Sequence, residues 1–322
     1  MSEEVYNDGY FDEVIPLDSR NKKKYKAGFI QWSVNGDRFY PTRETTSTLP
    51  SGFYIMGWDQ SAGTHFLKKR DIITEDIFQL PDKNFENIIG DVQRFWSNKK
   101  IYKKYNFVYK RGILLYGTHG CGKSSLIQLL CKDLINIHQG IVINISDRDD
   151  VFWFDDVISM IRDIEREKPV IVIIEDIDNF IADREVLTTL LNILDGNMRM
   201  NNVVTIATTN FIEDVENRIK ARPSRFDRRY NIGLPDDVVR KYFIEQKIKE
   251  NDLVKSNVSI DKIITDTKGF TIDHLKELIL SICVLGYDYD IAFKDVKDML
   301  NGKNLKVINP GETSIGFNIN KE

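Results

Sequence analysis

Cysteines, long apolar runs and a strong net charge are scarce or absent in this 322-residue sequence. Three cysteines without a CxxC pair do not build a disulfide framework, so we expect a reducing compartment. No apolar run approaches the ~20 residues that a transmembrane helix needs, and the acidic start lacks the apolar core of a signal peptide. A formal net charge of −4 gives no basic field that would draw the whole protein to nucleic acid or anionic lipid. We therefore expect a cytoplasmic protein with no membrane partner.

The first 80 residues are rich in aromatic residues, glycine and threonine. The stretches AGFIQWSVNG, DRFYPT, SGFYIMGW and GTHFLKK are typical of short strands broken by Gly and Asn turns. We predict a small β-rich N-terminal domain over residues 1–80.

From about residue 81 the pattern changes to apolar strands that alternate with helices. The apolar stretches are GILLYG, IVINIS, VIVIIED and VVTIATTN, and segments of helical spacing separate them. Such strands indicate an α/β fold with a parallel sheet that is covered on both faces, here over residues 81–235. Residues 236–302 have helical patterns only and predict a helical subdomain, and residues 303–322 predict a C-terminal tail.

The stretch GTHGCGKSS matches the pattern G-x-x-x-x-G-K-[ST], follows a predicted buried strand and opens a predicted helix. Its glycines let backbone N–H groups point at phosphate oxygens. Lys123 places a positive charge on the β- and γ-phosphates, and Ser124 offers a hydroxyl to Mg²⁺. An ordinary glycine-rich turn does not explain a lysine at this position. We predict that ATP or ADP binds the loop residues Gly117, Thr118, His119, Gly120, Cys121, Gly122, Lys123, Ser124 and Ser125.

Polar side chains follow two of the other predicted strands. Glu175, Asp176 and Asp178 follow the apolar strand VIVII and would repel one another without a cation. They predict a Mg²⁺ site at Ser124, Glu175 and Asp176, and a solvated turn at the strand end is the alternative. Asn210 ends VVTIATTN, at the strand end where open α/β sheets bind ligands. It would hold the attacking water or sense the γ-phosphate, and a helix cap is the alternative.

Arg222 and Arg225 flank a proline and a serine in RPSRFDRRY. Guanidinium groups stabilise the charge of phosphoryl transfer and are often supplied by a second subunit. A basic surface loop or a nucleic-acid contact is the alternative.

Together these motifs resemble the AAA ATPases of the AAA+ superfamily. The resemblance covers about residues 85–300, with the phosphate loop, IIED, LLNILDG, TTN and RPSRFDRRYNIGLPD in family order. The core looks most like the mitochondrial Bcs-type branch, whose membrane helix is absent here. The resemblance implies a P-loop AAA+ parallel sheet flanked by helices, with residues 236–302 as a lid.

By this resemblance Lys123 and Ser124 are the Walker A residues, and Asn210 is the first sensor. Glu175 stands where the family has its Mg²⁺-binding Asp, and Asp176 where it has the catalytic Glu. Because this acid pair is inverted, the resemblance leaves open which side chain activates water. The stretch GFTIDHL also lacks an arginine at the second-sensor helix.

The resemblance further implies an assembly. Arg222 and Arg225 match paired arginine fingers that act in trans, so we expect a homo-oligomeric, hexameric ring. The adenine pocket would be lined by Ile88, Ile89 and Gly90. The loop that grips substrate in the central pore would carry Phe152, Trp153 and Phe154, unless these aromatic residues form a hydrophobic staple at a helix start.

Three functions follow. The leading one is an ATP-hydrolysing ring that unfolds or remodels protein, with the N-terminal domain choosing the substrate or adaptor. The second is a nucleic-acid motor, such as a viral replication or packaging accessory, supported by a local arginine cluster that includes Arg218, Arg228 and Arg229. The third is a nucleotide-gated binding module that hydrolyses little, suggested by the inverted acids.

Overall fold

The computed structural model describes residues 31–35, 38–42, 45–60, 63–71, 77–180, 182–195, 200–213, 215, 225–248 and 258–302. The chain divides into two compact units, residues 1–50 and 51–322. In the first unit, β1 (Gln31–Asn35) and β2 (Arg38–Thr42) form an antiparallel hairpin. These two strands confirm the strands predicted there. The predicted C-terminal tail lies outside the described residues.

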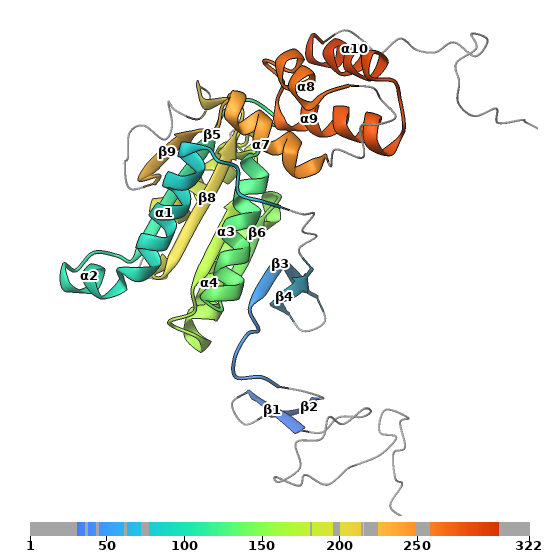
Figure 1. Cartoon of the computed structure of the whole chain (residues 1–322). Coiled ribbons are helices and arrows are strands. Elements are labelled where there is room, and N and C mark those ends of the chain that lie inside the picture. The colour runs from blue at the N-terminus through green and yellow to red at the C-terminus, as the bar shows by residue number, and fades with distance from the viewer. Residues whose placement is uncertain are drawn as a thin grey trace, which may run out of the picture. The chain divides into compact units, whose positions relative to one another are not determined.

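The second unit is built on a seven-stranded sheet (Figure 1) with the strand order β4-β3-β6-β7-β8-β5-β9. Neighbouring strands run parallel except β3 and β4. The strands are β3 (Gly52–Asp59), β4 (Thr64–Arg70), β5 (Lys110–Tyr116), β6 (Ile141–Ile145), β7 (Val170–Ile174), β8 (Val203–Thr209) and β9 (Arg228–Asn231). This mostly parallel sheet confirms the predicted α/β fold class.

The hairpin of β3 and β4 extends this sheet. Strand β3 pairs in parallel with β6, with Gly52 opposite Ile141 and Tyr54 opposite Ile143. The sequence placed both strands in an N-terminal domain that ends at residue 80, whereas the structure divides the chain after residue 50. The physical reason is that alternate burial along β3 identifies a strand with one buried face but does not identify the strand that it pairs with.

Helices cover both faces of the sheet. They are α1 (Lys83–Ser97), α2 (Lys99–Lys104), α3 (Lys123–Ile137), α4 (Arg148–Ile164) and α5 (Arg184–Asp195). Helices α1 and α3 pack with alternate residues of β5, Ile113 and Leu115, in one continuous core. Leu114, between them, is equally buried but lies outside that core. Helix α4 also lies outside it and contacts β3, β6 and α5. Successive buried residues of β5 therefore point to opposite faces of the sheet, each covered by a layer of helices.

The C-terminal region is helical, as predicted. Its elements are α7 (Asp237–Lys247), α8 (Ile260–Asp266), α9 (Ile272–Ile279), a π-helical turn η4 (Leu280–Val284) and α10 (Tyr289–Leu300). Side chains that cap the first turns of its α-helices are Asp236, Ser259, Thr271 and Asp288. Phe243 and Leu275 belong to the same continuous core as residues of α1 and α3.

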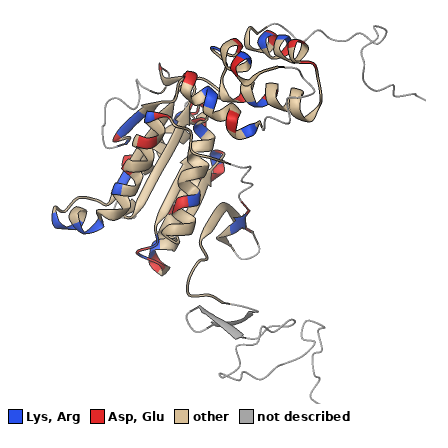
Figure 2. Ribbon diagram, in the orientation of Figure 1, with Lys and Arg blue, Asp and Glu red and all other residues tan. Residues whose placement is uncertain are grey.

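Most of the ribbon in Figure 2 is tan, and acidic and basic residues are interspersed along several of the helices. Helix α2 carries lysines and no acid in its sequence KKIYKK. Among the helices that the structure describes, none is long and apolar enough to cross a bilayer.

Candidate active site

The predicted phosphate loop lies between the end of β5 and the start of α3. Gly117 has φ +137°, and a Cβ there would lie 2.3 Å from the carbonyl O of Ile232. Only glycine fits this close backbone approach. Gly122 has φ +99° and caps α3 without a side chain, so the free N–H groups of the first helical turn open directly onto the loop. This is the geometry that binds a phosphate.

Lys123 is the cation at the centre of the loop, and it is only 8% exposed. Its Nζ donates hydrogen bonds to the carbonyl O of Gly117 at 2.7 Å, the carbonyl O of Thr118 at 3.0 Å and Oδ1 of Asn210 at 2.6 Å. These acceptors match the three donors of an ammonium group. Burial lowers the pKa of Lys123, and nearby acidic groups such as Asp176 oppose that shift. Phosphate oxygens would take over these same donors.

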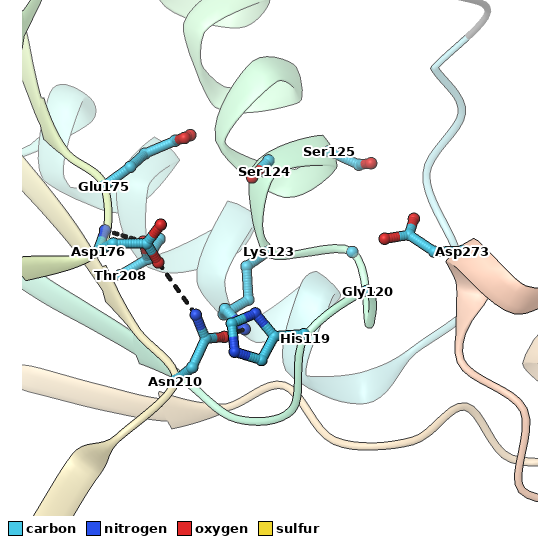
Figure 3. Close-up of a pocket in the computed structure, with 11 residues that line it drawn as sticks. His119, Gly120, Lys123, Ser124, Ser125, Glu175, Asp176, Thr208, Asn210 and Asp273 are labelled. Carbon is cyan, nitrogen blue, oxygen red and sulfur yellow. Dashed lines mark hydrogen bonds between the residues drawn. The ribbon is translucent and has the colours of Figure 1, made fainter. Parts of the chain in front are cut away.

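Asn210 connects this lysine to the strand-end acids (Figure 3). Its Nδ2 donates to Oδ1 of Asp176 at 3.0 Å, and the backbone N–H of Asp176 donates to Oγ1 of Thr208 at 2.9 Å. Asp176 has a left-handed φ of +48°, a conformation that a non-glycine residue rarely adopts. The ends of β7 and β8 therefore hold Asp176 and Asn210 in one hydrogen-bonded network with Lys123.

Glu175 and Ser124 form a second polar pair beside this network. Desolvation raises the pKa of Glu175, the charge of Asp176 raises it further, and the hydrogen bond with Ser124 lowers it. A hydroxyl and carboxylates are the hard oxygen ligands that Mg²⁺ prefers. Within the described residues, no group of three or more His, Cys, Asp or Glu side chains could hold a metal ion. The hydroxyl of Ser124 and the carboxylate of Glu175 fit a Mg²⁺ ion that takes its remaining ligands from phosphate and water.

Two adjoining cavities form the cleft. The first is lined by part of the phosphate loop and by Glu175, Asp176 and Asn210. The second is mainly apolar, and its apolar lining residues are Ile77, Phe78, Leu80, Phe243 and Ile272. The ring of Phe78 lies 5.7 Å from the ring of Phe243, and Nζ of Lys247 lies 5.4 Å from the centre of the Phe78 ring. A polar cavity beside an apolar one suits a ligand with a phosphate chain and a planar base.

The predicted adenine-pocket residues do not line either cavity. Ile88 is fully buried in the core, Ile89 packs against that core, and both lie on α1 with Gly90. The segment before α1, residues 77–80, supplies the apolar lining instead. The two cavities therefore give no support to an adenine pocket at residues 88–90, because Ile88 and Ile89 pack in or against the core.

Arg225 is buried and forms an ion pair within its own chain. Its Nε donates to Oδ1 of Asp195 at 2.9 Å and its Nη2 donates to Oδ2 at 3.0 Å. Asp195 is the last residue of α5, so this pair joins the end of that helix to the segment before β9. Arg222 lies outside the described residues. Action of either arginine in trans stays a prediction.

The predicted pore-loop aromatics lie in a helix. The side chain of Asp147 accepts a hydrogen bond from the N–H of Asp150 at 3.0 Å, so α4 begins at Arg148, before the aromatic residues. Phe154 is 1% exposed, and its assignment to a pore loop is wrong because it is a core residue. The ring of Trp153 lies 5.7 Å from that of His65 on β4. Phe152 lies beneath the guanidinium of Arg148.

The sequence does not predict several residues that line the cleft. Asp273 lines both cavities, and Ile77 and Phe78 line the apolar one. The stretch GFTIDHL contains Asp273, but its sequence indicates only that an arginine is missing there. Its contact with the phosphate loop joins segments about 150 residues apart. No local periodicity carries that information.

The central part of the chain matches a known family. Residues 113–234 match the family model described as ATPase family associated with various cellular activities (AAA). The chain carries an AAA domain. The matched residues run from β5 through the phosphate loop, the strand-end acids and Asn210 to the segment after β9. They include every residue that lines the polar cavity except Asp273.

Three curated relatives extend this comparison. The chain is 29% identical over 272 residues to a Plasmodium falciparum protein named as a cell division cycle ATPase, covering 80% of this chain and 20% of that protein. It is 33% identical over 164 residues to the mitochondrial chaperone BCS1 of Danio rerio, covering 46% and 37%. It is 25% identical over 238 residues to the vesicular-fusion protein SEC18 of Candida albicans, covering 63% and 30%. These alignments span between a fifth and somewhat more than a third of the relatives' own length.

Proposed function

We propose that this AAA domain binds ATP and hydrolyses it with Mg²⁺. The observation that carries the proposal is the network from Lys123 through Asn210 to Asp176, which joins the phosphate loop to the ends of β7 and β8. A structural turn does not need a buried ammonium beside a strand-end amide and carboxylate. The family match supports the same chemistry.

Each side chain has a role in this reaction. The N–H groups of the loop and of the first turn of α3 would bind the phosphate oxygens, and Lys123 would exchange its present acceptors for β- and γ-phosphate oxygens. Ser124 and Glu175 would hold Mg²⁺, which offsets phosphate charge when bound. Asn210 and Asp176 would orient a water molecule toward the γ-phosphorus. The new P–O bond forms as the bond to the β-phosphate oxygen breaks, ADP leaves, and Asp176 accepts the proton of the water.

We further propose that the chain works as a homo-oligomeric ring, a hexamer by the resemblance, in which an arginine completes a neighbour's site. Arg222 is the stronger candidate, because Arg225 is engaged with Asp195. Arg225 then anchors the chain three residues after Arg222. The support is the family-like order of these arginines in the sequence.

Protein is the substrate that we favour for the ring. One relative is named a chaperone and another a vesicular-fusion protein, which supports action on protein assemblies. The first unit of the chain would select the substrate or adaptor. The nucleic-acid alternative keeps one observation in its favour, the lysine-rich helix α2 with the exposed residues Tyr105 and Phe107 after it.

The test is the ATP hydrolysis rate per chain against protein concentration, with Mg²⁺ and saturating ATP. We expect a steep rise to a plateau and further stimulation by unfolded protein. Mixing the Arg222→Ala and Asp176→Asn proteins should restore part of the activity through composite sites. Stimulation by single-stranded DNA or RNA alone would replace the remodelling proposal with the nucleic-acid motor. Tight ATP binding without turnover at any concentration would contradict hydrolysis.

A further inference from the structure

Helix α9 contacts the phosphate loop directly. The backbone N–H of Asp273 donates to the carbonyl O of Gly120 at 3.1 Å. Gly120 has φ +72°, and a Cβ there would lie 2.8 Å from Oδ2 of Asp273 and 3.0 Å from Oγ1 of Thr271. The start of α9 therefore packs so close to Gly120 that a larger residue at this position of the loop would clash with it. This contact holds the Asp273 side chain at the cleft.

The carboxylate of Asp273 lies at the junction of the two cavities. Figure 3 shows it pointing from α9 toward Gly120, with Ser125 nearby. Ser124, Ser125 and Asp273 are the residues that line both the polar and the apolar cavity. In a nucleotide, the sugar joins the phosphate chain to the base. A ligand with its phosphates in the first cavity and its base in the second therefore has its sugar beside these residues.

Neither the dipole of α9 nor repulsion of phosphate accounts for an acid at this junction. An acid in the first turn favours a helix, because its charge complements the helix dipole. Asp261 does this in α8 without lining either cavity, so the dipole does not determine the position of Asp273. The charge of Asp273 would also repel phosphate, but the residue is exposed to solvent, which screens such repulsion.

A carboxylate at this junction matches the chemistry of a ribose. An ionised carboxylate only accepts hydrogen bonds and has two oxygens, and the adjacent 2′- and 3′-hydroxyls of ribose are two donors. Hydrogen bonds of this kind are charge-assisted and stronger than neutral ones. We propose that Asp273 binds the ribose hydroxyls and makes the site selective for nucleotides that carry the 2′- and 3′-hydroxyls over those that lack them. This inference rests on the proposed function, because it needs the nucleotide in the cleft.

The experiment compares the affinities of ATP and 2′,3′-dideoxy-ATP for the wild-type protein, Asp273→Ala and Asp273→Asn, each with Mg²⁺. We expect the wild type to prefer ATP about tenfold, which corresponds to about 1.4 kcal/mol. Asp273→Ala should weaken ATP binding until the two affinities agree within about twofold, with dideoxy-ATP unaffected. Asp273→Asn, which keeps one acceptor oxygen and the side-chain size, should lie between them.

Asp261→Asn is the matched control, because it neutralises a first-turn acid of α8 outside the cleft, and it should keep the full preference. Equal affinities of the wild type for both nucleotides would contradict the ribose contact but not the proposed binding of ATP. Tighter binding of both nucleotides by Asp273→Ala would identify Asp273 as a source of phosphate repulsion and also overturn the inference. No binding of either nucleotide by the wild type would contradict the proposed function itself.

Discussion

The two sides of the cleft are built differently. On the sheet side, Lys123, Asn210 and Asp176 follow three strands and bond to one another. On the helical side, Phe78 and Asp273 come from segments that are distant in the sequence. Phe78 packs against Phe243 of α7, and the N–H of Asp273 donates to the carbonyl O of Gly120. The sheet side therefore depends on short motifs and strand ends, whereas the helical side depends on how α7 and α9 pack on the rest. We expect the sheet side to control phosphate binding and chemistry, and the helical side to control recognition of the nucleoside.

The largest effect should come from Lys123→Ala on the sheet side. Removal of this buried ammonium leaves its acceptors unpaired and deprives the phosphates of their cation, so MgATP affinity should fall about 10³-fold. Equilibrium titration with a fluorescent ATP analogue measures this. Lys132→Ala, on the exposed surface of the same helix, is the control and should bind like the wild type. If the Lys123→Ala protein bound MgATP within threefold of the wild-type affinity, this would contradict phosphate binding by the loop.

Chemistry on the sheet side should depend on Asp176 more than on Glu175. Asp176→Asn keeps an acceptor for Asn210 but loses the base, so turnover should fall by about 10²- to 10⁴-fold while ATP still binds. Glu175→Gln should instead raise the Mg²⁺ concentration needed for half-maximal rate. Rates measured across a Mg²⁺ series separate these two roles. Full turnover by Asp176→Asn, with none by Glu175→Gln at saturating Mg²⁺, would reverse the assignment.

Arg225→Ala tests whether the scaffold of the sheet side depends on the ion pair with Asp195. Loss of one partner leaves the other charge uncompensated, and we expect the free energy of unfolding to fall by about 3 kcal/mol. Chemical denaturation measures this, and Asp195→Asn should reproduce part of the loss. Unchanged stability together with lost turnover would instead favour action of Arg225 on a neighbouring subunit.

The smallest effect should come from Phe78→Ala on the helical side. Loss of this ring from the apolar cavity should weaken ATP and ADP about tenfold, as expected for one buried aromatic contact. The affinity for tripolyphosphate, which has no base, should not change. Phe107→Ala is the control, because Phe107 is 70% exposed and lies outside the cleft. Equal weakening of tripolyphosphate would show that the two sides do not divide the ligand as described.

Local patterns predicted the sheet side because each feature spans few residues. The loop needs glycines at fixed spacing, and parallel apolar strands bring their polar ends to one edge of the sheet. These rules predict the fold class, and they predict that Lys123, Asp176 and Asn210 lie close together. The aromatic run alone does not show that α4 begins at Arg148, before these residues, because the side chain of Asp147 caps the helix there. The pairing of β3 with β6 and the approach of Asp273 to Gly120 are tertiary contacts that leave no local pattern.

The most direct test of the two-sided cleft is photolabelling with 8-azido-ATP, followed by mass spectrometry of the labelled peptides. The account predicts label in residues 77–80 or on α7 or α9. Excess ATP should prevent it, and Lys123→Ala should lose it. Label on residues 88–90 of α1, or label that excess ATP does not displace, would contradict the placement of the base in the apolar cavity.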